Sequence, residues 1–264
     1  MGVTNVTPDS FSDGGRFVQP LDALEQARLL IAEGADWLDL GAESSRPGAQ
    51  PVPADLEIAR LIPLIRALRA ESRTPISVDT MKPEVARAAM AAGAHMWNDI
   101  TALRHAPDSL DVAAELGCQV VLMHMQGEPA GMQAEPRYDD VVAEVAEFLA
   151  ARAEAAMAAG VARDRIWLDP GIGFGKHMIR HNLPLLAGLG RITALGFPVL
   201  LGASRKSFIG ALDPGGKSPD QRLGGSIAAA LAGAAAGVAA VRVHDVRETV
   251  QALAVWAAIA GAAG

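Results

Sequence analysis

PISVD, at residues 75–79, is a short apolar run that ends in a carboxylate. Short, continuously apolar runs are typical of parallel strands that are buried on both faces. Four further runs also end in polar or charged residues, namely HMWND (95–99), IWLD (166–169), PVLLGASRK (198–206) and AAVRVHD (239–245). In a (β/α)₈ barrel the chemistry is carried at the carboxyl ends of the strands. The pattern therefore predicts a barrel whose functional site lies at one end.

The rest of the chain alternates strand-like runs with Ala-rich helical patterns, and no linker interrupts it. Eight strand candidates lie at 3–6, 37–40, 76–79, 95–99, 119–124, 166–169, 199–202 and 241–244. Helical patterns, which supply the crossovers of a parallel sheet, lie at 21–34, 52–71, 82–93, 107–117, 139–160, 181–195, 219–237 and 245–261. Eight such units fit a closed TIM barrel better than an open doubly wound sheet. We expect residues 1–264 to form a single α/β domain.

Composition excludes several classes of protein. Half of the 264 residues are hydrophobic and only 4% are aromatic, which suits close packing of helices on strands. The net charge of -7 offers no basic stripe for a nucleic-acid backbone, and no apolar run approaches the ~18 residues that span a membrane. The single Cys118 excludes a disulfide framework and predicts a small core residue. We expect a soluble, cytoplasmic protein that binds neither nucleic acid nor membrane.

Three loops are rich in Gly, Pro, Ser and Asp. The first two, NVTPDSFSDGGR (5–16) and GAESSRPGAQP (41–51), follow adjacent strands and carry complementary charges, which favours lids over the barrel mouth to solvated connections. The third, DPGIGFGK (169–176), lacks the spacing of a Walker A loop or a dinucleotide fingerprint. We therefore interpret it as a tight turn that places Asp169 at the mouth with Phe174 and Lys176 beside it.

Two further motifs carry cations at strand ends. SRKS (204–207) lies at a strand-to-helix junction, where free backbone N–H groups favour an anion. The alternative is a serine N-cap with solvated Arg205 and Lys206. RVHD (242–245) places Arg242 and His244 on one face of a strand, because side chains two residues apart share a face. The pair predicts a polyanion site, although a lone inward histidine is often satisfied by a neighbouring carbonyl.

Eight ordered blocks spanning the chain resemble the dihydropteroate synthases, the folate-pathway enzymes that sulfonamides target. The blocks are MGVTNVTPDSFSDGG, LDLGAESSRPGA, SVDTMKPEVARAA, NDI, LMHMQG, DPGIGFGK, GASRKS and RVHD. This resemblance implies a TIM-barrel transferase that joins 6-hydroxymethyl-7,8-dihydropterin diphosphate to p-aminobenzoate. The products would be 7,8-dihydropteroate and pyrophosphate.

The same resemblance implies the site residues. A pterin pocket would contain Asp79, Asn98, Ile100, Met123, Asp169, Lys206 and Arg242. The p-aminobenzoate site would contain Phe11, Ser45, Arg46, Pro47, Phe174, Lys206 and Ser207. The diphosphate would be bound by Asn5, Arg46, Arg242 and His244, with Mg²⁺ held between Asn5 and the diphosphate. Catalysis would rest on Asp13, which would stabilise a developing pterin cation, together with Arg46, Lys206 and Arg242.

Two other functions are compatible with a pterin-binding barrel. A methyltransferase acting on methyltetrahydrofolate would keep the Asp/Asn/Asp cluster without needing the two lid loops or SRKS. A pterin-binding scaffold without turnover would be expected to lose Asp13, Arg46 or Lys206, and all three are present.

The Ala-rich last helix, around Ala252 to Ile259, predicts a homodimer face.

Overall fold

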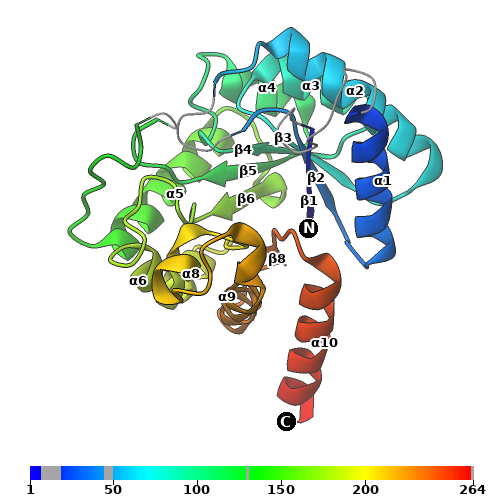
Figure 1. Cartoon of the computed structure of the whole chain (residues 1–264). Helices are drawn as coiled ribbons and strands as arrows, with labels where there is room; N and C mark the ends of the chain where they lie inside the picture. Colours follow the sequence, from blue (N-terminus) through cyan, green and yellow to red (C-terminus); the bar gives the residue numbers. More distant parts are fainter. Residues whose placement is uncertain (7–18, 45–49, 129–130, 263–264) are drawn as a thin grey trace.

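The computed structural model describes residues 1–6, 19–44, 50–128 and 131–262. Within these ranges, short parallel strands surround one axis and helices cover their outer side (Figure 1). Strands β1 to β6 pair in chain order as one six-stranded sheet, and β7 pairs with β8. The strands are β1 (Gly2–Asn5), β2 (Leu38–Gly41), β3 (Ile76–Asp79), β4 (Met96–Asp99), β5 (Gln119–Met123), β6 (Ile166–Asp169), β7 (Leu200–Leu201) and β8 (Ala240–Val241).

Single parallel bridges close the two gaps between these sheets. Leu168 bridges to Val199, and Gly2 bridges to Val243, so β6 meets β7 and β8 meets β1. The backbone N–H of Val243 donates to the carbonyl of Met1 at 2.9 Å across the second gap. The expected eight-stranded TIM barrel is therefore confirmed. The expected strand 199–202 is too long, because only Leu200 and Leu201 form a regular ladder. The expected strand 241–244 is displaced, because β8 begins at Ala240 and only Val241 of the expected range lies in the ladder.

The helices follow the expected order with two differences: the short helix at Ser207–Leu212 was not predicted, and one predicted helix is divided. The predicted helix at 181–195 is two short helices that meet at Gly188. A Cβ at Gly188 would lie 2.7 Å from both methyl carbons of Val142, so the break permits a close approach to α5. The helices are α1 (Gln19–Ala32), α2 (Ala54–Glu71), α3 (Pro83–Ala91), α4 (Ser109–Leu116), α5 (Val141–Ala158), α6 (Asn182–Ala187), α7 (Leu189–Thr193), α8 (Ser207–Leu212), α9 (Leu223–Ala235) and α10 (Val246–Ala262), with 3₁₀ turns η2 (Arg163–Arg165) and η3 (Pro219–Arg222).

Side-chain alternation along the strands builds two separate apolar layers. One layer lies between strands and helices and includes Leu38, Val78 and Leu168, all fully buried. The other fills the amino-terminal end of the barrel interior and is called the floor here. It consists of Met1, Met96, Val121 and Leu200, with Trp37, Trp167 and Ala240 packed against them. Because side chains two residues apart share a face of a strand, the residues two positions after these floor residues point into the barrel mouth.

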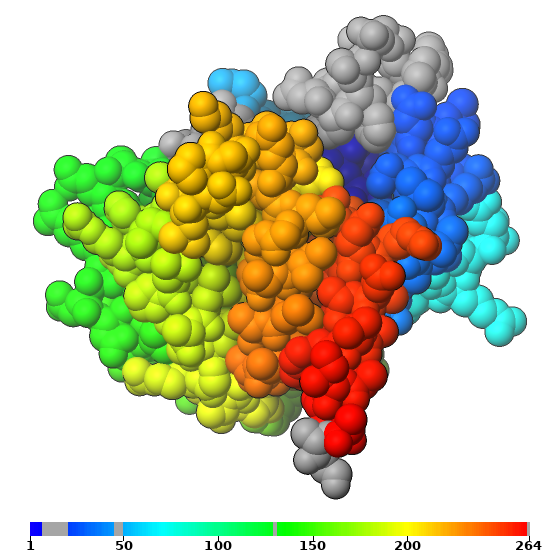
Figure 2. All heavy atoms as spheres, turned by 60° about the horizontal axis from the view of Figure 1, so that its bottom comes forward, coloured from blue at the N-terminus to red at the C-terminus, as the bar shows by residue number. Residues whose placement is uncertain are grey.

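The last helix, α10, packs along α9 and leaves much of its surface exposed (Figure 2). Val250, Val255 and Ile259 are large apolar residues on that exposed surface. In the described part of the chain, no helix combines the length and the hydropathy that a bilayer crossing requires.

Candidate active site

Polar side chains gather at the carboxyl ends of the strands, as expected, and are called the mouth cluster here. Its members are Asp79 on β3, Asn98 on β4, Asp169 on β6, Lys206 after β7 and Arg242 after β8. The Nη2 of Arg242 donates to Asp79 Oδ2 at 2.8 Å. Arg242 also lies close enough to Asp169 to interact electrostatically, as does Lys206. The structure therefore brings together the five polar residues predicted for the pterin pocket.

Asp39 on β2 belongs to this cluster, and sequence reasoning missed it. Its side chain is completely buried, and its Oδ2 accepts a hydrogen bond from Arg242 Nε at 2.6 Å. The amide of Asn98 also lies 3.4 Å from both Asp39 carboxylate oxygens. A carboxylate inside the apolar run WLDLG (37–41) was the available signal. It escaped notice because it stands inside its run, two residues short of the strand end.

Burial and mutual charge shift the protonation of the cluster. Burial raises the pKa of Asp79 to about 7 against the attraction of Arg242, and the nearby Asp39 adds to the increase. Burial also raises the pKa of Asp169, which Lys206 and Arg242 partly offset. For Arg242 the two carboxylates outweigh burial and raise the pKa further. The guanidinium thus stays charged, while Asp79 can titrate near neutral pH.

An apolar wall stands beside the mouth cluster. Ile100 and Met123, both predicted, are buried there, and the ring of Phe174 packs against the wall. Met125 and Met132 complete it and were not predicted. Met125 could have been found from the sequence, because it lies two residues after Met123 in LMHMQG, at the end of a strand. Met132 comes from the following loop, for which the sequence offers no periodic pattern.

The DPGIGFGK segment forms the tight turn that was expected. Asp169 Oδ1 accepts from the backbone N–H of Gly171 at 2.7 Å. Gly171 has φ +66°, and a Cβ there would lie 1.9 Å from the carbonyl oxygen of His124, so no other residue fits. The ring of Phe174 lies 4.2 Å from the Nζ of Lys206. Lys176 lies under this turn, almost fully buried, and is close enough to Asp169 to interact with it electrostatically.

The SRKS turn is held by side chains from two other segments. Arg205 has φ +59°, which is costly for a residue with a Cβ. Its N–H donates to the hydroxyl of Ser226, and its carbonyl accepts from Arg222, each at 2.9 Å. Its guanidinium pairs with Asp245 at 2.5 and 3.0 Å. These contacts fix the turn from which Lys206 projects.

The alternative of a serine N-cap with solvated cations is wrong for this turn. Lys206 is the N-cap of α8 and makes no side-chain capping bond. Arg205 is ion-paired rather than solvated. Ser207, the first residue of α8, is exposed.

His244 projects from the loop after β8 and meets Ser204, whose hydroxyl lies 3.0 Å from its Nδ1. The histidine is therefore satisfied by a hydroxyl rather than a carbonyl. Burial lowers the pKa of His244 to about 4, and Arg242 and Arg205 add to the decrease. The ring is neutral at neutral pH, so only Arg242 of this pair carries a permanent charge.

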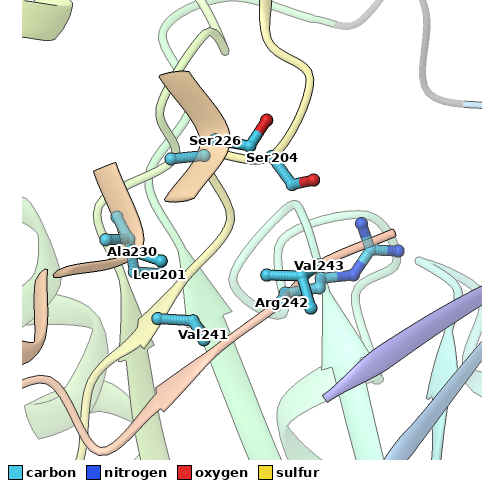
Figure 3. Close-up of a pocket in the computed structure, with 8 residues that line it drawn as sticks. Leu201, Ser204, Ser226, Ala230, Val241, Arg242 and Val243 are labelled. Atoms are coloured by element: carbon cyan, nitrogen blue, oxygen red, sulfur yellow. The ribbon is translucent and has the colours of Figure 1, made fainter. Parts of the chain in front are cut away.

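Figure 3 shows how the Arg242 side chain is separated from the neighbouring apolar residues. Arg242 points away from Val241, Leu201 and Ala230, which pack together between β7, β8 and α9. The gap that those apolar residues line is too narrow to admit a water molecule. The guanidinium is thus directed to the mouth and not to this gap.

Asn5, predicted to coordinate Mg²⁺, is the last residue of β1 and is partly buried. Among the described residues, no three His, Cys, Asp or Glu side chains gather into a metal-binding group. Mg²⁺ is often held by one or two protein oxygens together with water and substrate phosphates. A single amide oxygen fits that arrangement and does not fit an ion bound by protein alone.

Five predicted site residues lie outside the described part of the chain: Phe11, Asp13, Ser45, Arg46 and Pro47. The start of the second loop is described and carries charged contacts. Lys82 Nζ lies 2.5 Å from Glu43 Oε2 and also pairs with the fully buried Glu57. Glu43 in turn accepts from the N–H of Val52, on the far side of the loop. This ion-pair cluster fixes both ends of the segment that carries Arg46.

The chain is similar to known pterin-binding enzymes in both sequence and structure. A family model described as "Pterin binding enzyme" matches residues 1–244 and defines the class. The Escherichia coli (strain K12) dihydropteroate synthase is 48% identical over 96% of this chain and 88% of its own length. The solved Xanthomonas albilineans dihydropteroate synthase with 4-aminobenzoic acid superposes with a TM-score of 0.92, at 52% identity, covering 98% of this chain and 92% of that one.

A Yersinia pestis dihydropteroate synthase, solved as a sulfonamide drug complex, has a TM-score of 0.92 at 43% identity. The superposition covers 99% of this chain and 94% of the Yersinia pestis chain. The chain belongs to the dihydropteroate synthase family of pterin-binding enzymes. The expected resemblance is therefore confirmed over nearly the whole length.

Proposed function

We propose that the mouth cluster and the apolar wall form the site where the chain performs the reaction of its family. The reaction condenses 6-hydroxymethyl-7,8-dihydropterin diphosphate with p-aminobenzoate in folate biosynthesis. The observation that carries the assignment is the buried, charged cluster of Asp39, Asp79 and Arg242 at the barrel mouth. Buried ion pairs add little net stability, because the cost of desolvating the charges offsets their attraction, so a purely structural role for the cluster is a poor explanation.

The pterin ring would bind with its polar edge against the cluster. Its amino and N–H groups are donors that suit the carboxylates of Asp79 and Asp169 and the amide of Asn98. Lys206 can donate to the acceptor atoms of the ring, and Arg242 can stack on the ring face. Ile100 and Met123 would cover the apolar surface of the ring. Such a pocket, mostly apolar with a few fixed polar groups, is typical of small-molecule sites.

The p-aminobenzoate would lie on the Phe174 side of the mouth. The Nζ of Lys206, which is 4.2 Å from the Phe174 ring, can meet the benzoate carboxylate there. Ser207 is exposed at the start of α8 and can add a hydroxyl. Phe11, Ser45, Arg46 and Pro47 complete the proposal from the sequence, because they belong to the two loops that follow β1 and β2.

The diphosphate would lie near the ends of β1 and β8. Arg242 would bind it through the guanidinium nitrogens that its carboxylate partners leave available, and Arg46 would close over it. His244, neutral in the unliganded protein, would donate a single hydrogen bond. Asn5 would hold Mg²⁺ through its amide oxygen, and the bound ion would neutralise part of the diphosphate charge.

The protein's part in the chemistry is to position charge. The bond from the pterin methylene carbon to the diphosphate oxygen breaks, and the amine nitrogen of p-aminobenzoate bonds to that carbon and loses a proton. If cleavage runs ahead of bond formation, positive charge develops on the pterin, and Asp13 would stabilise it as a preorganised carboxylate. Loop closure after diphosphate binding would make p-aminobenzoate the second substrate to bind.

Pyrophosphate release tests the function directly. The substrate 6-hydroxymethyl-7,8-dihydropterin diphosphate is supplied with Mg²⁺, with and without p-aminobenzoate. Release that depends on p-aminobenzoate is the expected result. Pterin binding without such release would contradict the proposal and would fit a methyltransferase or a silent pterin-binding protein.

Residue-level support comes from Asp79→Ala, which should abolish pterin binding in calorimetry. Asp108→Ala changes an exposed carboxylate before α4 and serves as the matched control. Unchanged affinity in the Asp79 variant would remove that residue from the pocket. Sulfonamides, as analogues of p-aminobenzoate, should compete with it for the same side of the mouth.

The proposal includes a cytoplasmic homodimer. A chain with one cysteine forms no intrachain disulfide, which is compatible with a reducing compartment. The exposed apolar residues of α10, Val250, Val255 and Ile259, would lie in the interface. Light scattering at micromolar concentration should give the mass of a dimer, and a monomer mass would contradict this part.

A further inference from the structure

We propose that Lys176 is a positioning residue for the p-aminobenzoate side of the site, acting through Phe174 and Lys206. Its side chain is 1% exposed and lies beneath the DPGIGFGK turn, so it cannot contact a substrate directly. The proposal rests on the function proposed above, because it assigns p-aminobenzoate to the surface formed by Phe174 and Lys206.

The contacts of the amine define its role. Nζ lies 2.9 Å from His124 Nδ1 and donates to the carbonyl oxygens of Gly171 and Phe174, each at 3.0 Å. The carbonyl of His124 is further away, at 3.4 Å. A lysine ammonium has three donors, and these three close acceptors match them one to one. The turn is therefore wrapped around a single hydrogen-bonding centre, the Nζ of Lys176.

His124 is suited to accept one of these hydrogen bonds. Burial, together with the charge of Lys176, lowers the pKa of His124 to about 3. The neutral ring then accepts at Nδ1 and carries its proton on the other nitrogen. The ring of Phe148 on α5 packs edge-on against His124 at 4.8 Å between centroids, which holds the imidazole in place. Through this histidine the turn after β6 is anchored to the end of β5.

A second, partly buried lysine shows what is unusual about this arrangement. Lys82 pairs with two carboxylates, Glu43 and Glu57. In the described ranges Lys176 makes no ion pair, and its close partners are carbonyls and an imidazole. Burial therefore lowers the pKa of Lys176 to about 7, with Asp169 opposing the decrease and Lys206 adding to it. Such a costly group is poor filling for a core, whereas a methionine would be adequate.

The path from this centre to the site is short. The Phe174 carbonyl is fixed by Lys176, the Phe174 ring faces the Nζ of Lys206 at 4.2 Å, and Lys206 is the proposed partner of the benzoate carboxylate. The charged groups that face Lys176 are Asp169 on β6 and Lys206 after β7, and the uncharged His124, the residue after β5, also faces it. Without the ammonium, the Phe174 carbonyl loses its donor and the ring loses its fixed orientation.

The test compares Lys176→Met with Tyr138→Phe. Tyr138 donates its hydroxyl to the carbonyl of Gly175 at 2.8 Å, so the control variant also removes a tie to this turn, but one that does not reach Phe174. Steady-state kinetics should show that Lys176→Met raises the KM for p-aminobenzoate at least about tenfold. The calorimetric Kd for 6-hydroxymethylpterin should change less than about threefold. Tyr138→Phe should leave both values near those of the wild type.

Two results would overturn the inference. One is an unchanged KM for p-aminobenzoate with a lower fraction of folded enzyme, which would show a purely structural role. The other is an equal loss of pterin and p-aminobenzoate affinity. If Lys176→Met fails to fold, Lys176→Gln retains two donors without the charge and is judged by the same KM split. Wild-type pyrophosphate release, measured first, separates failure of this inference from failure of the proposed function.

Discussion

The floor and the mouth of the barrel are built by the same strands and differ in almost every physical respect. On β4 the floor residue Met96 is followed two positions later by Asn98, and on β6 Trp167 is followed by Asp169. One step of the strand period thus changes the interior from apolar packing to buried charge. The comparison teaches that stability and binding are separated along the barrel axis, so substitutions at the two ends should fail in different ways.

The largest effect should come from Arg242→Met at the mouth. The substitution leaves Asp39 and Asp79 without their shared cation, and removing one partner of a buried pair costs about 3–5 kcal/mol. We expect the free energy of unfolding in urea to fall by that amount and pterin binding to disappear in calorimetry. A variant that keeps wild-type stability would show that the cluster is not coupled through this guanidinium.

Met96→Ala at the floor should destabilise by about 2–5 kcal/mol without changing the site. Met96 is completely buried and lies below the polar residues, so its loss leaves a cavity and removes no ligand contact. The urea midpoint should fall, while the pterin Kd measured below the unfolding transition should stay within about threefold of wild type. A large loss of affinity would show that the two ends are mechanically coupled.

Intermediate in size is the pH dependence of pterin binding. The pKa of Asp79 in the free protein is raised to about 7, and we expect its ionised form to accept hydrogen bonds from the pterin. Affinity should therefore rise as pH rises to 7 and level off above it, weakening about tenfold for each unit below. The stability of the folded state should change in the opposite direction. Between about pH 4 and 7 the folded state keeps a proton on Asp79 that the unfolded state has lost, so the free energy of unfolding falls as pH rises through this range.

Calorimetry with 6-hydroxymethylpterin at pH 6, 7 and 8 checks the binding part of this prediction. Asp79→Asn should remove the bend, since an amide does not titrate. An affinity that is flat over this range would contradict the role of Asp79 as an ionised acceptor.

The smallest effect should come from the ion pair between Arg137 and Glu135, which belongs to neither end. Both side chains are at least 75% exposed, and exposed pairs contribute little. Arg137→Ala should leave the urea midpoint unchanged within error. A clear shift would indicate that the loop after β5 contributes to stability through this pair.

The sequence predicted the barrel because its signal is local and repeated. Short apolar runs, each ending in a polar residue, give the order of strands without any knowledge of packing. Asp79, Asn98 and Asp169 were found for the same reason, since each stands at the end of a run. Asp39 was missed because nothing local reveals that a carboxylate inside a strand will face an arginine 203 residues away.

Other features depend on contacts between distant segments. The break at Gly188 is set by Val142, and the two-residue ladders of β7 and β8 are set by their neighbours. Burial of Lys176 was also beyond the sequence, because an isolated lysine after a glycine-rich turn normally predicts an exposed side chain. Its acceptors converge only when the turns after β5 and β6 pack together.

The closure of the barrel by single bridges has a consequence for how the molecule opens. The β7–β8 pair is joined to the six-stranded sheet by one bridge on each side, whereas β1 to β6 share continuous ladders. Amide hydrogens of the β7–β8 pair should exchange with solvent before those of β3 to β5, because fewer backbone hydrogen bonds must break to release this pair. A ligand that binds Asp79 on the six-stranded sheet and Lys206 or Arg242 next to the β7–β8 pair would link the two sheets and oppose their separation. Slower exchange on pterin binding should therefore be concentrated in this pair.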